Sequence, residues 1–427
     1  MSTGHKLSLF LLATGTSILP AIAHAQSTAA PAPVINNTIA TQTAVPSLVN
    51  QPAGDIALFV EGNASLTYDD NVQRRRVKND DWAAMLSAAI GARGDFGSAR
   101  ASLRAEVDQS EYFQNGDENT TDWSIGGQIA DKFDAGSGYF SAGFSQSHED
   151  RGDPNASVTD RKRTVYNLAE VGAGGVLKGA GVKFGADVSF RHYDFSDNRQ
   201  LNNSVMNNDD RDRDQFGVSG KAAVELSPGY SLFGRVAYHT VNYSSARDDF
   251  GFNRDSHDLT VGGGVDFEVT DTLTGDIYAG YITHGYDDPR FANVNTVGFG
   301  GNLNWTAGPA TTISLAADRS VQETVDPRYR GYLTSSVSLS VNQTISTAVS
   351  LSGGIGYGHD DYRKATATVT TNRADDNLNA SIGLSYSPVK AVSVGLSYAW
   401  SKRVSSATFP GDEYSDNTLS ATLGIHF

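Results

Sequence analysis

The sequence contains no cysteine. Disulfide bonds, thiolate catalysis and cysteine-ligated metal sites are therefore excluded, and the absence fits a cell-envelope protein that folds without oxidation. Only 39% of the 427 residues are hydrophobic, and no segment after the first 25 residues holds 18 consecutive apolar positions. We therefore expect no transmembrane helix in the rest of the chain.

Positive charge is also in deficit, since the formal net charge is −15. We expect no nucleic-acid partner, because a basic surface is what binds phosphate backbones. The chain is instead rich in glycine (44 residues), tyrosine (18) and phenylalanine (19). No long apolar stripe at helical spacing exists to bury these aromatic rings. Their spread through the chain, together with β-branched residues, excludes simple disorder.

The N-terminus has the features of a secretory signal peptide, predicted as residues 1–25. Lys6 precedes an apolar run that Pro20 interrupts, and the small-residue motif AHA ends at Ala25, where we expect cleavage. A retained membrane anchor is the alternative, but the proline and the cleavage motif favour removal. Residues 26–54, rich in Ala, Thr and Pro, are predicted to form a flexible periplasmic leader.

From Asp55 onward, runs of about 11 to 14 residues alternate between polar and apolar positions, which is typical of half-buried strands. In the segment 182–195, for example, Val182, Phe184 and Phe190 fall on one face, and Lys183 falls on the other. We identify 18 such runs, with 16 as the alternative. They begin near residues 55, 82, 99, 121, 138, 163, 182, 214, 230, 257, 273, 295, 310, 332, 348, 377, 391 and 417.

The connections between runs alternate between short and long. Short ones include KGAG and SPG, whereas long ones include 149–163, 196–213 and 360–376. Such alternation is typical of an up-and-down barrel whose two rims face different compartments, and a soluble sandwich with Greek-key connections has no reason to show it. The predicted fold is all-β: a transmembrane antiparallel β-barrel over residues 55–427, with short turns in the periplasm and long loops outside.

Aromatic residues are expected to mark both rims as belts at the lipid headgroups. The candidates for the outer belt are Tyr68, Tyr112, Tyr193, Tyr243, Tyr286 and Tyr357, and those near the short turns are Phe133, Tyr230, Phe267, Trp305 and Tyr386. Core packing of sheet aromatics is the alternative, but it would not favour both strand ends.

The last predicted strand alternates strictly and ends on an aromatic ring. Because a membrane sheet must leave no open edge, we expect this strand to pair with the first one. The strand also resembles the C-terminal signal by which bacterial outer-membrane proteins are recognised for assembly. Its apolar positions are Leu419, Ala421, Leu423, Ile425 and Phe427.

Strand parity predicts which charged residues face the lumen. The candidates for lumen selectivity are Arg100, Arg104, Lys183, Arg191, Lys221 and Arg235. Acids such as Glu106 and Asp187 fall on the same faces. Two interpretations stay open: a mixed ladder that selects charged solutes, or side chains that pair with one another and fill the lumen.

The predicted loops repeat an Asp- and Arg-rich theme at 68–76, 286–290, 325–330 and 359–363. These segments could hold a divalent cation or contact sugars and lipopolysaccharide phosphates, but solvated loops with local ion pairs are favoured, because no calcium-loop spacing occurs. We predict no enzyme and no cofactor. The sequence has no Gly-x-Ser-x-Gly elbow, and its histidines are scattered singly. The leader is too short for the plug of a TonB-dependent transporter.

One segment carries a family pattern. Residues 68–71 (YDDN) close the first predicted strand, and a polar loop ends in 80–81 (DD). A second strand then ends in a glycine turn, and a third closes with Tyr112 ahead of Asp122. Over residues 62–127 the chain thereby resembles the putative β-barrel porin family, type 2, of Gram-negative outer membranes. The resemblance implies a role in polysaccharide passage or surface attachment, and it brings no catalytic residues.

The predicted function is passage of hydrophilic solutes, or export of exopolysaccharide, across the outer membrane of a Gram-negative bacterium. The alternative is a structural or adhesive surface protein whose lumen is closed and whose loops bind a ligand. The expected partners are outer-membrane lipid and lipopolysaccharide, the barrel assembly machinery and components of polysaccharide export.

Overall fold

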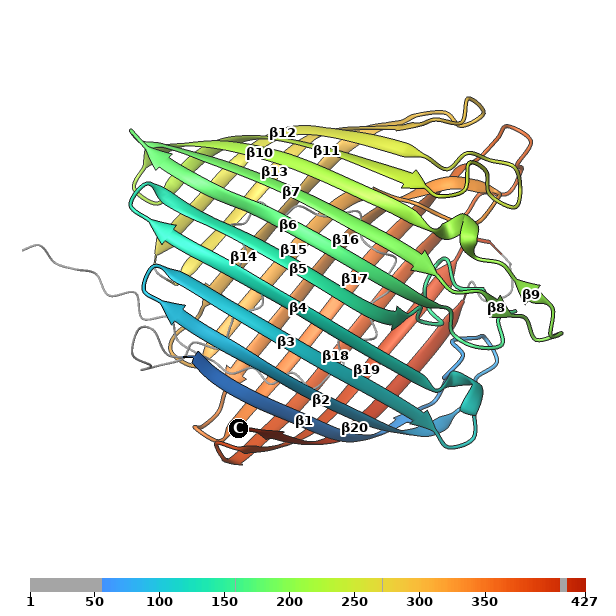
Figure 1. The fold of residues 1–427 in the computed structure, drawn as a ribbon, viewed down its shortest axis with the longest axis horizontal. Helices are drawn as coiled ribbons and strands as arrows, with labels where there is room; N and C mark the ends of the chain where they lie inside the picture. Colours follow the sequence, from blue (N-terminus) through green and yellow to red (C-terminus); the bar gives the residue numbers. More distant parts are fainter. Residues whose placement is uncertain (1–55, 158, 271, 408–412) are drawn as a thin grey trace, which may run out of the picture.

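The computed structural model describes residues 56–157, 159–270, 272–407 and 413–427. The predicted signal peptide and leader lie outside the described residues. Within them, one antiparallel sheet of 18 strands closes on itself as a barrel (Figure 1). The expected strand number is thus confirmed, and 16 is wrong.

The strands follow the chain round the barrel, apart from a small hairpin in one loop. The first nine wall strands are β1 (Ile56–Asp69), β2 (Asp81–Phe96), β3 (Ala99–Tyr112), β4 (Thr120–Phe133), β5 (Gly136–His148), β6 (Val165–Gly179), β7 (Val182–Phe195), β10 (Arg213–Ser227) and β11 (Tyr230–Tyr243). The other nine are β12 (Ser256–Thr270), β13 (Leu273–Tyr286), β14 (Val294–Thr306), β15 (Thr311–Gln322), β16 (Tyr329–Thr344), β17 (Val349–Lys364), β18 (Ala374–Val389), β19 (Val392–Ser405) and β20 (Tyr414–His426). The loop between β7 and β10 holds the hairpin β8 (Asn198–Arg199) and β9 (Val205–Met206) and the 3₁₀ turn η3 (Asp209–Arg211), and η2 (Gly116–Glu118) lies between β3 and β4.

The barrel closes between β20 and β1, as the alternation of the last strand predicts. The register runs from Glu61 opposite His426 to Asp69 opposite Thr418. It is extended by two backbone hydrogen bonds between Val60 and Phe427, of 3.0 and 2.9 Å. Closure satisfies the backbone groups of both strands, which a bilayer requires because it offers no water.

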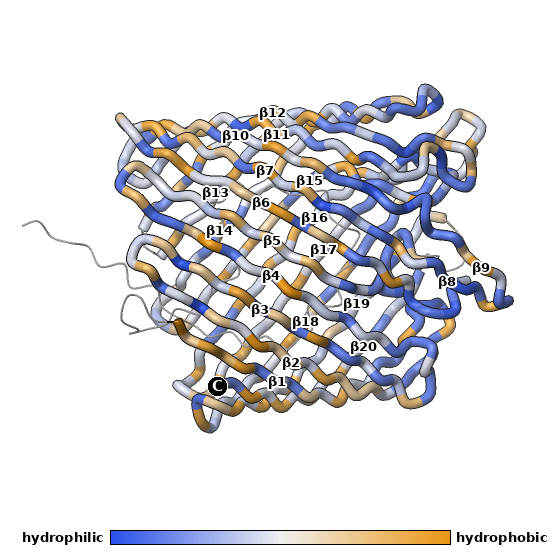
Figure 2. The backbone as a smooth tube through the Cα atoms, viewed as in Figure 1, coloured by the Kyte–Doolittle hydropathy of each residue, from blue (hydrophilic) through white to orange (hydrophobic). Residues whose placement is uncertain are grey.

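Alternation gives the wall an apolar outside and a polar inside. Phe184 and Phe190 on β7 are 57% and 42% exposed, while Asp187 between them faces the lumen. In Figure 2 the apolar residues cover the wall, and the hydrophilic ones gather at the end that carries β8 and β9. Among the described residues, the larger of two buried apolar clusters lies near the long loops: Ile282, Tyr286, Phe291, Val294, Val321, Leu333 and Ala365.

Short and long connections alternate round the barrel as predicted. Turns such as 97–98 and 180–181 join strands at one end, where Gly97 and Gly181 adopt positive φ angles of 85° and 79°. The long loops, such as 149–164 and 196–212, lie at the other end. No helix in the described part of the chain is long and apolar enough to cross a membrane. We call the two ends the short-turn end and the long-loop end.

The predicted outer aromatic belt is only partly correct. The ring of Tyr68 lies tilted against the exposed Trp82, and Tyr357 is 43% exposed. In contrast, Tyr193 and Tyr286 are 4% and 8% exposed and face the lumen. Tyr112 and Tyr243 lie on lumen-facing positions too, where they contact Arg163 and Arg213 respectively. The reason is strand parity, since each of these four residues is an odd number of positions from the lipid-facing residues of its strand. The aromatics predicted near the short turns face outward, among them Phe133, Tyr230, Trp305 and Tyr386.

Candidate functional site: the barrel lumen and its outer mouth

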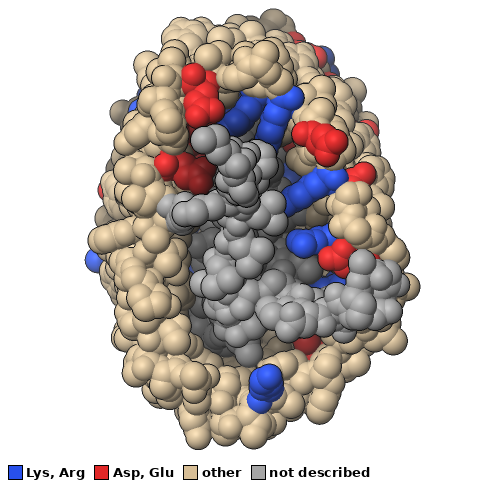
Figure 3. Space-filling view, turned by 90° about the vertical axis from the view of Figure 1, so that its left-hand side faces the viewer, with Lys and Arg blue, Asp and Glu red and all other residues tan. Residues whose placement is uncertain are grey.

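A hollow of about 300 Å³ opens in the lumen at the short-turn end, and we call it the vestibule. Figure 3, which views that end, shows Lys, Arg, Asp and Glu side chains around the opening. Its lining includes two glycines, Gly138 and Gly175, which lie opposite each other on β5 and β6. A Cβ atom on Gly175 would lie 2.5 Å from the carbonyl oxygen of Ser137, so a larger residue there would require the backbone to shift.

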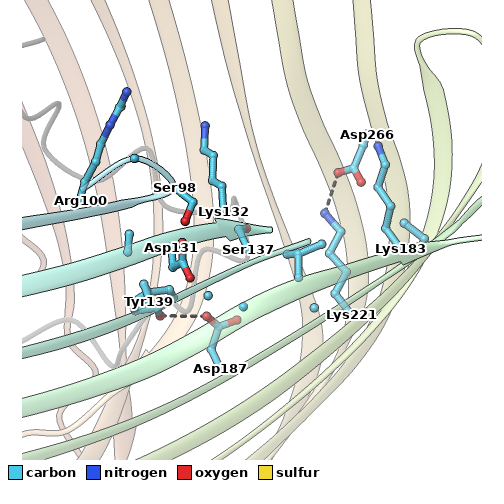
Figure 4. A pocket seen from close by; sticks show the side chains of 17 residues that line it. Ser98, Arg100, Asp131, Lys132, Ser137, Tyr139, Lys183, Asp187, Lys221 and Asp266 are labelled. Carbon is cyan, nitrogen blue, oxygen red and sulfur yellow. Dashed lines mark hydrogen bonds and ion pairs between the residues drawn. The ribbon is translucent and has the colours of Figure 1, made fainter. Parts of the chain in front are cut away.

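Three of the six predicted selectivity residues, Arg100, Lys183 and Lys221, line the vestibule (Figure 4). Lys221 forms an ion pair of 2.7 Å with Asp266 on β12. Arg100 lies 3.6 Å from Asp95 but keeps a strongly exposed side chain. A solute in the vestibule can therefore contact cationic side chains. Neighbouring carboxylates neutralise part of their positive charge.

The other three lie apart from the vestibule. Arg104 is held between Glu61 at 2.6 Å and Glu106 at 3.2 Å. Arg191 lies 3.5 Å from Glu170 on β6, and the guanidinium of Arg235 lies 4.2 Å from the ring centre of Tyr278. The structure thus brings these residues to separate places on the wall and pairs several of them. The lumen therefore contains both cations that line the vestibule and charged side chains that pair with one another.

At the long-loop end, the β5–β6 loop (149–164) folds over the barrel mouth. Asp150 forms an ion pair of 3.3 Å with Arg74 of the β1–β2 loop. Arg151 binds the buried carboxylate of Glu118, in η2, at 2.9 Å. The guanidinium of Arg211, in η3, donates to Glu149 at 3.0 Å. Ion pairs with loops on both sides therefore fix the course of this loop.

The same loop reaches the far side of the mouth. The guanidinium of Arg403 on β19 donates to the carbonyl oxygen of Gly152. The backbone N–H of Val325, in the β15–β16 loop, donates to the side-chain oxygen of Asn155 at 3.1 Å. Between these segments lie two small hollows of about 50 and 30 Å³. The described loops therefore span the long-loop end, which we call the closed mouth, and the vestibule lies at the short-turn end.

Two carboxylates of the β5–β6 loop have opposite electrostatic environments. Burial and the neighbouring charge of Glu149 raise the pKa of Asp153 to about 7. Burial also acts on Asp150, but the guanidinium groups of Arg74 and Arg163 outweigh it and lower the pKa of that carboxyl. Asp153 is therefore the loop carboxyl that can gain a proton near neutral pH.

The Asp- and Arg-rich loop segments form local ion pairs, as favoured by the sequence. The pairs Asp288–Arg290 and Asp326–Arg328 each span 2.5 Å, and Asp361–Arg363 spans 3.0 Å. One acidic group in the described residues could in principle hold a cation: Asp69, Asp70 and Asp416, whose ligand atoms lie within 4.8 Å of one another. Lys78 and Arg74 already pair with Asp70 and Asp416, so the group fits an ion-pair network better than a metal centre.

Sequence reasoning missed the residues that close the mouth, chiefly Glu118, Asp153, Asn155 and Arg403. They belong to loops or strand ends, where no periodicity reports on contacts. The histidines stand singly in the sequence, but the structure brings His239, His257 and His284 to one hollow. Each histidine near the long-loop end also pairs with an acid of a neighbouring segment. The pairs are His148–Asp122, His192–Asp214, His239–Asp258, His257–Asp287, His284–Glu323 and His359–Asp376.

Comparison with known families identifies the barrel. The family described as "Putative beta-barrel porin 2" matches residues 50–427, which is nearly all of the predicted mature chain. The chain belongs to this family. It is a porin-like outer-membrane β-barrel, which favours a transport channel over an enzyme, and the resemblance inferred from residues 62–127 is confirmed.

Solved structures similar to this barrel include proteins of Pseudomonas aeruginosa and Acinetobacter baumannii. OpdO of Pseudomonas aeruginosa aligns with a TM-score of 0.44 at 12% identity, over 87% of this chain and 98% of that chain. OccK1 (OpdK) of the same species gives 0.43 at 11% identity, over 87% and 99%. The siderophore receptor PirA from Acinetobacter baumannii gives 0.43 at 8% identity, over 89% and 81%. No curated protein sequence matches the chain.

Proposed function

We propose that this barrel passes hydrophilic solutes across the outer membrane of a Gram-negative bacterium. The observation that carries the proposal is the vestibule, a polar hollow of about 300 Å³ inside a wall that is apolar outside. A solute that enters from the short-turn end meets Lys183, Lys221 and Arg100, with Asp187 and Asp266 between them. Such a wall receives water-soluble molecules and excludes lipid.

The solute class that fits best is a neutral or anionic saccharide, including a chain of exopolysaccharide on its way out. Lys183, Lys221 and Arg100 can form ion pairs with carboxylates of an anionic saccharide. Tyr139 adds an aromatic ring to the vestibule wall. The proposed partners are lipopolysaccharide around the barrel, the assembly machinery that would recognise the strand ending in Phe427, and export components beneath the short turns.

Single-channel conductance of the refolded mature protein in a planar bilayer tests this proposal. We expect openings whose ion selectivity shifts toward cations when Lys183 and Lys221 are both replaced by glutamine. A well-folded, heat-modifiable barrel that never conducts would contradict a channel.

The closed mouth supports a second candidate, a surface protein whose loops bind a ligand. The β7–β10 loop, with its own hairpin β8–β9, extends from the long-loop end of the barrel (Figure 1). Deleting residues 196–212 should leave assembly intact, because the wall strands do not depend on this loop. The deletion also removes Arg211, which binds Glu149 of the β5–β6 loop, so conductance is measured beside adhesion. Loss of cell-surface adhesion without loss of conductance would favour this second function.

A further inference from the structure

The seam between β14 and β15 ends early. The ladder joins Gly300–Thr306 to Thr312–Asp318 and stops there. Beyond it, the β14 segment Val294–Phe299 stays in the sheet through β13, and the β15 segment Arg319–Gln322 stays in it through β16. This is the shortest seam among the described wall strands. It leaves one edge of each strand without its neighbour near the long-loop end, where a barrel normally keeps its wall continuous.

Beyond the end of this seam, the β15–β16 hairpin lies inside the barrel. On β15, Leu315 is 40% exposed toward lipid, whereas Val321, six residues later on the same face, is 7% exposed. On β16, Val337 is 42% exposed, and Leu333 on the same face is 2% exposed. The face that meets lipid in the lower part of this hairpin is therefore covered in its upper part.

The cover comes from the inner face of β13. Val321 and Leu333 lie opposite each other in the register and belong to one apolar cluster with Ile282, Tyr286 and Phe291. Ile282 and Tyr286 occupy lumen-facing positions of β13, since Ile277 and Tyr281 carry its lipid-facing side. The outer face of the hairpin thus packs on the inner face of its neighbour, as it must if the hairpin bends into the lumen.

Polar contacts from several segments hold the tip of the hairpin. The hydroxyl of Ser256 donates to Glu323 at 2.6 Å, and His284 lies 3.6 Å from the same carboxylate. The guanidinium of Arg254 in the β11–β12 loop donates to the carbonyl oxygens of Thr324 at 3.1 Å and Tyr329 at 2.9 Å. The bond between Val325 and Asn155 joins the tip to the β5–β6 loop across the mouth. These contacts are hydrogen bonds, which can be exchanged for hydrogen bonds to water when the tip moves.

We propose that the end of the β15–β16 hairpin is a gate with two positions. In the closed position it bends into the mouth, as in this structure. In the open position it returns to the wall and continues the ladder with β14, which places Ser320 opposite Gly298 and Gln322 opposite Thr296 in the existing register. In this movement the hairpin loses its apolar contacts with β13 and gains backbone hydrogen bonds with β14. The hydrogen bond between Val325 and Asn155 breaks at the same time. The proposal rests on the proposed function, because the gate controls solute access to the lumen.

The absence of cysteine allows each position to be locked by an engineered disulfide in the full-length protein. The pair T296C/Q322C can close only when the hairpin lies in the wall, and N155C/V325C only when it lies in the mouth. The matched control is N302C/A316C, whose residues already face each other in the ladder. Disulfide formation is followed by gel mobility without reductant, and conductance is measured in a planar bilayer before and after reduction.

We expect all three pairs to cross-link under mild oxidant. Conductance should rise several-fold when T296C/Q322C is oxidised, fall when N155C/V325C is oxidised, and recover on reduction in both. If the control cross-links and T296C/Q322C does not, the movement is disproved. Equal conductance in the two locked positions disproves the gate. No current in any variant, with cross-linking as expected, overturns the proposed channel function and is distinguishable from a failure of the movement.

Discussion

Single charges in the lumen set the field that a solute meets on its way through the barrel. Arg191 and Arg235 face the lumen on β7 and β11, where they contact Glu170 and Tyr278 respectively. Replacing both arginines with glutamate changes the local charge by four units. At a distance of about 10 Å in water, this corresponds to on the order of 1 kcal/mol for a passing monovalent ion, or a several-fold change in permeability ratio.

The predicted result for the R191E/R235E double variant is therefore a shift of selectivity toward cations, measured as the reversal potential in a salt gradient. R199E is the matched control, because Arg199 lies in the β8–β9 hairpin outside the lumen. Selectivity that stays the same in the double variant would remove these two residues from the lining of the pore.

Asp153 makes the closed loop sensitive to pH. The groups that act on it are Glu149 in the same loop, Arg211 in η3, Arg403 on β19 and Tyr332 on β16. Because burial raises its pKa to about 7, the folded loop binds this proton more tightly than the unfolded chain does. The stability that the protonated carboxyl gives is complete below the ordinary aspartate pKa near 4 and is lost as the pH rises toward 7.

We thus expect the β5–β6 loop to exchange its amide hydrogens faster at pH 8 than at pH 5, after correction for the intrinsic pH dependence of exchange. D153N should remove most of this difference, because asparagine cannot ionise. A wild-type loop with equal protection at both pH values would show that Asp153 does not titrate in this range.

At the scale of elements, the strands could be predicted and the course of the loops could not. Alternation fixes a strand locally, so the run expected from residue 182 begins there, and the run expected near 417 begins at Tyr414. The mouth depends on contacts between distant segments, such as Asn155 with Val325, which lie 170 residues apart. A local sequence period carries no information about such a distant contact. The vestibule could not be predicted either, because its lining comes from seven strands whose side chains meet only in the closed barrel.

Glu118 connects two elements at the closed mouth. Its carboxylate is almost fully buried and binds both Arg151 and Arg163, which tie η2 to the β5–β6 loop. In E118Q the two arginines lose their counter-charge, which should destabilise the closed loop by about 3 kcal/mol, or on the order of a hundredfold in the opening equilibrium. Hydrogen exchange of the loop, or its cleavage by added protease, measures the opening.

The neighbouring residue provides the control for this change. Asp117 pairs with Arg161 at 3.0 Å, but both side chains are about half exposed, so D117N should alter loop opening by less than about 1 kcal/mol. Equal effects of D117N and E118Q would mean that net charge, and not the buried pair, holds the loop.

At the scale of the whole molecule, the orientation of β20 decides both closure and contact with lipid. Leu423 is 51% exposed on the outside of the wall, and Thr422 beside it bonds Ser65 at 2.8 Å on the inside. An arginine in the lipid-facing half of a barrel strand costs about 2–4 kcal/mol, whereas the lumen tolerates charge. L423R should therefore lower the stability of the refolded barrel by about this amount, measured by urea titration in lipid vesicles, and T422R by less than about 1 kcal/mol. The opposite order would place the apolar face of β20 inside the barrel, and the outward band, the polar vestibule and the closing seam with β1 would then be wrong together.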